Sequence, residues 1–144
     1  MSRTPPGTRA DYRHFHPLTT RWMDNDAFRH VNNVNYFSFF DTAVTHFEMT
    51  QAGIDLLDGP LRCVVAEVQC RYHSSLAFPD RIDVGLRVAR IGGSAIRYEI
   101  AVFREGEHEA AAEGYFIHVL VESGTQRPQP IPDAMRERLR TIAV

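Results

Sequence analysis

Apolar side chains recur at three- and four-residue spacing over one long segment, residues 33–52. They form a single stripe flanked by Tyr36 and Ala43, and its members are Phe37, Phe40, Val44 and Phe47. This spacing is typical of an amphipathic helix with one buried face. Gly53 follows directly and is a natural helix end. The pattern therefore predicts one long, strongly aromatic helix, beginning at Asn33 or Val34, that lies centrally and is well covered.

The apolar period changes from helix to strand after residue 60. Apolar and polar residues alternate over 64–72, 82–88 and 96–102, and residues 108–121 form a further long strand. Alternation of this kind predicts half-buried strands. The turns between them are Phe78-Pro79-Asp80, Ile91-Gly92-Gly93-Ser94 and Arg104-Glu105-Gly106-Glu107. Residues 13–22 are also expected to be extended, and Pro132-Asp133 to begin a short final helix.

One long helix and one antiparallel sheet must bury each other's apolar faces, so the predicted class is α+β, with the sheet wrapped around the helix. The tract Ala110-Ala111-Ala112 and Gly114 suggest close packing against something bulky. Residues 1–10 are rich in Pro, Gly, Thr and Arg and are predicted to be poorly ordered. Residues 11–144 are expected to form a single domain.

Composition and charge narrow the classes of function. The chain has 144 residues, a formal net charge of −2 and no long basic run, which argues against a nucleic-acid partner. No apolar run approaches the ~20 residues of a membrane span, and the N-terminus has no apolar export core. A cytoplasmic location is the expectation. Cys63 and Cys70 lie an odd number of residues apart in one strand, so they are predicted to be reduced thiols on opposite faces.

Candidate chemistry concentrates in residues 21–36, which read RWMDNDAFRHVNNVNY. Asp26 and His30 lie just before the expected helix start, and Asn32 and Asn33 are good helix caps. A carboxylate beside the unpaired N–H groups of a helix start can attack a carbonyl, or activate water, while the amides stabilise the oxyanion. Asp24 is instead expected to be structural, bonding loop amides.

Simpler interpretations stand beside this one. Asp26 could merely cap a turn, and both asparagines could serve only as caps. The histidines show no metal-ligand spacing with a supporting third ligand, so no metal site is predicted. Gly92-Gly93 lacks the Lys-Ser/Thr of a phosphate-binding loop. No metal or redox cofactor is called for.

The segment Trp22-Met23-Asp24-Asn25-Asp26-Ala27, followed by His30-Val31-Asn32-Asn33 and Tyr36, resembles the hotdog-fold acyl thioesterases. The similarity is to the 4-hydroxybenzoyl-CoA thioesterase group and its broad-range bacterial acyl-CoA relatives. Weaker matches are Ala66-Glu67-Val68 through Phe78-Pro79-Asp80, and Ile131-Pro132 before the last helix. The resemblance covers roughly residues 13–142.

The resemblance implies hydrolysis of an acyl thioester, with coenzyme A as part of the substrate and no separate cofactor. It assigns the catalytic carboxylate to Asp26 and the oxyanion-binding amide to the backbone N–H of Asn33. His30 is implied as a catalytic or loop-orienting residue, and Asn32 and Tyr36 as contacts of the loop and substrate. Plant acyl-carrier-protein thioesterases share the HVNN element, but Phe28 replaces the Asn of their pattern.

The resemblance has two further implications. Basic residues near the Gly92-Gly93 turn contact coenzyme A phosphates in the family, which makes the flanking Arg90 and Arg97 candidates, although the turn itself lacks basic residues and plain surface charge is the simpler explanation. The family's active site forms between subunits, so a homodimer or homotetramer is expected. Two other classes stay open, a hotdog hydratase or dehydratase and a non-catalytic acyl-CoA-binding sensor. The presence of Asp26 argues against pure binding.

Overall fold

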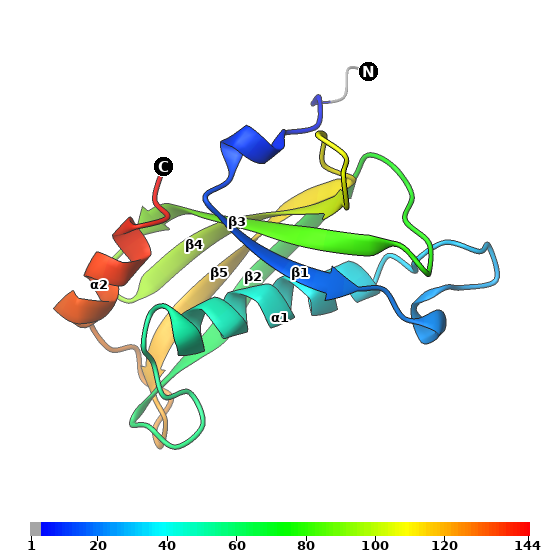
Figure 1. Ribbon diagram of the computed structural model, residues 1–144. Coiled ribbons are helices and arrows are strands. Elements are labelled where there is room, and N and C mark those ends of the chain that lie inside the picture. The colour runs from blue at the N-terminus through cyan, green and yellow to red at the C-terminus, as the bar shows by residue number, and fades with distance from the viewer. Residues whose placement is uncertain (1–3) are drawn as a thin grey trace.

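The protein is described by a computed structural model that covers residues 4–144 (Figure 1). The elements in chain order are η1 (Arg9–Asp11), β1 (His14–Thr19), η2 (Trp22–Asp24), α1 (Asn35–Thr50), β2 (Leu61–Tyr72), β3 (Arg81–Ile91), β4 (Ala95–Arg104), β5 (Ala112–Glu122) and α2 (Asp133–Arg140). The strands form one five-stranded sheet in the order β1-β3-β4-β5-β2, and every neighbouring pair is antiparallel. This is the α+β hotdog fold that the sequence predicts.

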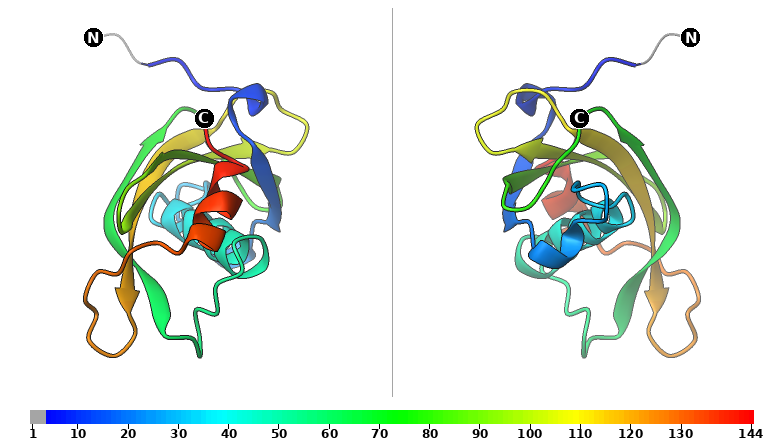
Figure 2. Two further views of the ribbon diagram at one scale, coloured as in Figure 1. Left: turned by 90° about the vertical axis from the view of Figure 1, so that its left-hand side faces the viewer. Right: turned by 90° about the vertical axis from the view of Figure 1, so that its right-hand side faces the viewer.

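The sheet curves around α1, as the end-on views show, and α2 lies across one end of the concave face (Figure 2). The predicted aromatic stripe is the core-facing side of the helix, with two changes. Phe39 and Glu48 join the buried face, and Phe37 is only partly buried. The helix has the predicted location but begins at Asn35, because Val34 occupies the N-cap position.

An irregularity in β2 corrects the prediction for the two cysteines. The register between β2 and β5 shifts between Val65 and Glu67, where an extra residue enters β2. A bulge of this kind reverses the alternation of faces that follows it. Cys63 and Cys70 are therefore both packed against the main core, not on opposite faces, and both are free thiols.

Gly114 explains the close packing expected of β5. It lies opposite Cys70 on β2, and a Cβ placed on it would overlap the Gln69 carbonyl oxygen. The crowding partner is therefore the β2 backbone, not a bulky side chain. Ala110, Ala111 and Ala112 are buried as expected, but the strand itself begins only at Ala112.

The first strand ends at Thr19, short of the predicted residue 22, because residues 22–24 turn into η2. Residues 1–3 of the segment expected to be poorly ordered lie outside the described residues. Farther along that segment, the Gly7 N–H donates to Glu113 Oε1 at 2.9 Å and Thr8 pairs with Glu109. These contacts fix Gly7 and Thr8 against the sheet, which the composition did not predict. Within residues 4–144, no helix has the length and apolar character that crossing a membrane requires.

Candidate functional site

Asp24 anchors the loop that leads into α1. Its side chain is fully buried and forms an ion pair with Arg21 at 2.8 Å, while also accepting the Arg21 backbone N–H at 2.7 Å. Its carbonyl accepts the N–H of Asn32 at 2.9 Å and the side-chain amide of Asn35 at 3.0 Å. Asp24 thus ties the loop to the helix start, in the structural position expected for it.

Asp26 is held in place by contacts to both carboxylate oxygens. Oδ1 accepts the Phe28 N–H at 2.8 Å, and Oδ2 accepts the side-chain amide of Asn32 at 3.2 Å. The backbone N–H of Asp26 donates to the His30 carbonyl at 3.0 Å, which closes the turn between them. The carboxylate is half-buried and is fixed by these neutral donors.

The helix start beside Asp26 leaves one amide unpaired. The Asn32 side-chain oxygen accepts the Val34 N–H at 3.1 Å and so closes a turn just before the helix, whereas the N-cap residue itself is Val34 and makes no side-chain cap. The Asn33 N–H has no acceptor among residues 4–144. The Asn33 carbonyl is fixed, because it accepts the Tyr72 hydroxyl at 2.9 Å and the Tyr36 N–H at 3.3 Å. An oriented, unpaired N–H at a helix start suits a negatively charged oxygen.

These groups lie around an open cavity of about 440 Å³. Four predicted residues line it together: Asp26, His30, Asn33 and Tyr36. Asn32 lies behind them, bonded to the Asp26 carboxylate. His30 is exposed, and its observed contact to Asp26 runs through its backbone carbonyl. Phe28, the departure from the plant pattern, stands 83% exposed at the same cavity.

The end of β2 supplies a wall that the sequence did not predict. It consists of Tyr72, His73, Ser74 and Ser75. His73 Nε2 lies 3.0 Å from Glu113 Oε2, and Glu113 is buried. Glu113 also contacts Arg71 and the Tyr12 hydroxyl, at 3.3 and 3.1 Å. The cue in the sequence was a polar run directly after an alternating strand, but only the fold shows that it reaches the start of α1.

Burial changes the pKa of Tyr36, on the aromatic side of the cavity. Desolvation, with a small contribution from Cys70, raises the pKa of Tyr36 to about 12. Tyr36 and Tyr72 pack edge to face with their ring centroids 5.0 Å apart. Tyr36 therefore remains a neutral phenol at physiological pH and contributes an apolar ring to the wall.

Arg90 and Arg97 are not brought to Asp26 within the chain. They line a different cavity of about 520 Å³ beside the β3–β4 hairpin. The Arg97 guanidinium stacks 3.8 Å from the centroid of the Tyr115 ring and contacts Glu99 at 3.4 Å. Their predicted role with coenzyme A phosphates stays a prediction.

Comparisons with known proteins identify the family and fold of the chain. The thioesterase-like superfamily matches residues 20–139. Among solved structures, the PA5185 protein of Pseudomonas aeruginosa strain PAO1 is 46% identical with a TM-score of 0.94, and the match covers 96% of this chain and 97% of that one.

Two further structures are similar along most of their length. A thioesterase from Thermus thermophilus, complexed with coenzyme A and Zn, is 30% identical with a TM-score of 0.75, covering 90% of this chain and 98% of that one. PA2801, a putative thioesterase from Pseudomonas aeruginosa, is 28% identical with a TM-score of 0.80, covering 88% and 97%. No functionally curated protein matches the chain significantly. The family match over most of the chain, on a hotdog fold, shows that this protein belongs to the thioesterase-like superfamily and is a thioester hydrolase.

Proposed function

We propose that this enzyme hydrolyses acyl-CoA thioesters, with Asp26 as the catalytic carboxylate and the Asn33 N–H as the oxyanion donor. The observation that carries the proposal is that a fixed carboxylate and an unpaired helix-start amide line one cavity. The 30% identical relative from Thermus thermophilus is described as complexed with coenzyme A, which supports the choice of carrier.

Two routes use the same groups. In the first, Asp26 attacks the thioester carbonyl, the thiolate leaves, and water hydrolyses the resulting mixed anhydride. In the second, Asp26 takes a proton from water, the hydroxide attacks the carbonyl, and the C–S bond breaks as the thiolate leaves and receives that proton. In both, the carbonyl oxygen becomes negative and the Asn33 N–H donates to it. Removing one such donor in other enzymes costs about 10²–10³ in kcat, which is ~3 kcal/mol.

The surrounding residues position these two groups. Asn32 holds the Asp26 carboxylate with its amide and accepts the Val34 N–H with its oxygen. His30 closes the Asp26 turn through its carbonyl, and the exposed imidazole is available to the thioester or the leaving group. Tyr36 offers an apolar surface to the acyl portion. No step requires a metal or redox cofactor, since coenzyme A enters as part of the substrate.

We also propose that the enzyme works as a homodimer or a homotetramer. Strand β2 lies at an edge of the sheet and carries the exposed apolar side chains Val64, Val65 and Val68. An apolar edge strand is a template for pairing with a second copy. In such an assembly Arg90 and Arg97 would serve as phosphate contacts for coenzyme A.

The test is thiol release from a panel of aliphatic and aromatic acyl-CoAs. Asp26→Asn is expected to lose at least ~100-fold in kcat, the scale of removing a general base or nucleophile. Asp41→Asn is the matched control, because Asp41 is exposed on α1 and makes no described side-chain contact. It should leave kcat unchanged. A folded Asp26→Asn enzyme with parental kcat would overturn the assignment.

The same panel separates the remaining classes. Tight acyl-CoA binding without thiol release would indicate a sensor. Hydration of crotonyl-CoA without release of thiol would indicate a hydratase. Either result would contradict the proposed acyl-CoA hydrolysis, whereas release of free thiol from acyl-CoA would support it.

A further inference from the structure

Four polar side chains meet in the core beneath the C-terminal part of α1, away from the proposed active site. They are Glu48 of α1, Cys63 of β2, Tyr98 of β4 and His118 of β5. Glu48 and His118 are 1% and 2% exposed, and Tyr98 is fully buried. Glu48 Oε2 accepts the Tyr98 hydroxyl at 2.9 Å and lies 3.1 Å from His118 Nδ1. The four residues are called the core cluster below.

The core cluster holds two polar atoms without a partner. Among residues 4–144, neither Glu48 Oε1 nor His118 Nε2 has a hydrogen-bond partner, and both atoms are buried. Buried polar atoms are paired in nearly all native structures, so each exception calls for an explanation such as an ion or a water molecule. A carboxylate oxygen and an imidazole nitrogen are both ligands for a metal ion.

A third ligand lies within the same space. One ligand atom from each of Glu48, Cys63 and His118 can be chosen so that all three lie within 4.8 Å of one another. Zinc binds carboxylate oxygen and imidazole nitrogen at about 2.0–2.2 Å and thiolate sulfur at about 2.3 Å. These bond lengths put tetrahedral ligands roughly 3.3–3.8 Å apart. Side-chain adjustments of about 1 Å would therefore close the three ligands around one ion.

We propose that Glu48, Cys63 and His118 bind one divalent transition-metal ion of the zinc class. Carboxylate, thiolate and imidazole together suit zinc or cobalt and are a poor set for magnesium or calcium, which prefer oxygen ligands. Tyr98 donates to the Glu48 carboxylate and so orients this ligand toward the ion. Water takes the fourth position, because the described protein offers no further ligand atom in this set.

The thiol sets the proton balance of binding. Without an ion the sulfur carries its proton. The ion forms a bond to sulfur as the S–H proton leaves to solvent, so affinity increases with pH.

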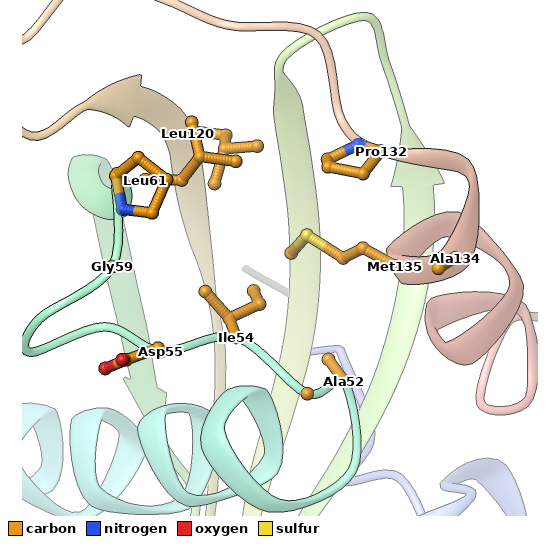
Figure 3. A pocket seen from close by; sticks show the side chains of 11 residues that line it. Ala52, Ile54, Asp55, Gly59, Leu61, Leu120, Pro132, Ala134 and Met135 are labelled. Carbon is orange, nitrogen blue, oxygen red and sulfur yellow. The ribbon is translucent and has the colours of Figure 1, made fainter.

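A small apolar cavity of about 210 Å³ lies between the end of α1, α2 and the sheet (Figure 3). Leu61 and Leu120 line it (Figure 3), and each is two residues from a cluster member, Cys63 and His118, along the same strand. Residues two apart on a strand share a face. Leu61 and Leu120 therefore share the inner face of the sheet with Cys63 and His118.

The role implied is structural. The ion would join α1 to β2 and β5, three elements that come from distant parts of the chain. The proposal is independent of thioester hydrolysis, since it uses none of the groups around Asp26. The sequence did not indicate it, because the three ligands come from three elements and show no local metal-binding spacing.

The experiment titrates chelator-treated, full-length protein with Co²⁺ and follows the thiolate-to-cobalt charge-transfer band in the near ultraviolet. One ion per chain is expected, with the band present, and Zn²⁺ should displace it. Cys63→Ala should lose the band and bind at least ~10-fold more weakly. Cys70→Ala is the matched control, because Cys70 is the other partly buried thiol and lies outside the core cluster. It should keep the band.

Folding of each variant is checked by far-ultraviolet circular dichroism before titration. His118→Gln provides a second test, since it should weaken Co²⁺ binding while leaving the thiol present. Absence of the charge-transfer band in the parent protein would overturn the proposal. Equal Co²⁺ affinity in the parent, Cys63→Ala and His118→Gln would overturn it as well.

Discussion

Replacing Gly114 by alanine is expected to destabilise the sheet strongly. The added Cβ would overlap the Gln69 carbonyl oxygen and lie 2.8 Å from the Gln69 carbonyl carbon and 2.9 Å from the Cys70 Cα. All three atoms belong to the β2 backbone, so no side-chain rotation relieves the contact. Carbon atoms pack at about 3.5–4.0 Å, so β2 and β5 must move apart by roughly 1 Å at this point.

The cost has two parts. Overpacking of a core typically costs about 1–3 kcal/mol. Separating the strands also weakens one or two ladder hydrogen bonds, at about 1 kcal/mol each. The free energy of unfolding should therefore fall by about 2–5 kcal/mol, a large part of the ~5–15 kcal/mol typical of a domain. The displacement lies opposite Cys70, two residues before Tyr72, so it should also disturb the active-site wall.

Urea unfolding followed by far-ultraviolet circular dichroism measures the change. Gly93→Ala is the matched control, because a Cβ there has no heavy atom within 4 Å. Its free energy of unfolding should stay within about 0.5 kcal/mol of the parent value. If Gly114→Ala unfolds within about 1 kcal/mol of the parent, the close approach of the two backbones is not rigid and the reasoning is wrong.

Three further predictions concern the site and its surroundings. Tyr72→Phe removes the donor to the Asn33 carbonyl but keeps the ring, so kcat should fall about 10-fold, a fraction of the loss on deleting an oxyanion donor; steady-state kinetics check this, and a fall in affinity alone would contradict it. Asn32→Ala leaves the Val34 N–H at the start of α1 without its acceptor and should lower the free energy of unfolding by about 1 kcal/mol. Thermal denaturation measures this, and an unchanged Tm would count against it. Burial raises the pKa of Tyr36 to about 12, so the folded state resists ionisation that the unfolded chain undergoes from about pH 10. The contribution of neutral Tyr36 to the free energy of unfolding is fully present below about pH 10 and is lost as pH rises to about 12, by at most about 2.7 kcal/mol. In Tyr36→Phe the urea midpoint should therefore decline less steeply over this pH range than in the parent. An identical decline in both proteins would refute the assignment to Tyr36.

The sequence predicted the structure well wherever an element or a group of site residues depends on residues that are close together in the chain. The change from a three- and four-residue spacing to alternation predicted α1 and the strand run, because burial of one face imposes those periods. Asp26, Asn32 and Asn33 are close in the chain, so one loop brings them together. The family resemblance separates Asp26 from Asp24, and the buried ion pair of Asp24 with Arg21 agrees with the structural role expected of it.

The sequence failed where contacts join distant segments or where regular order breaks. Tyr72 and His73 enter the site because the end of β2 lies beside the start of α1, which no local pattern encodes. The two cysteines face the same way because a bulge in β2 inserts one residue. In the sequence, Glu48 has the character of an exposed residue of a helix. Only its contacts with Tyr98 and His118 explain why it is buried.

The order of the strands has a consequence for synthesis of the chain. Among residues 4–144, strand β2 pairs only with β5, and the contact between His73 and Glu113, near the ends of that pair, spans 40 residues. At a translation rate of about 5–20 residues per second, those residues take about 2–8 s to appear. During this interval β2, with its valines, has no partner strand in its own chain. In those seconds, the β2 strands of chains that are being synthesised on the same messenger RNA are most able to pair with each other instead of with β5. A chaperone that covers residues 61–72 would therefore raise the yield of folded enzyme.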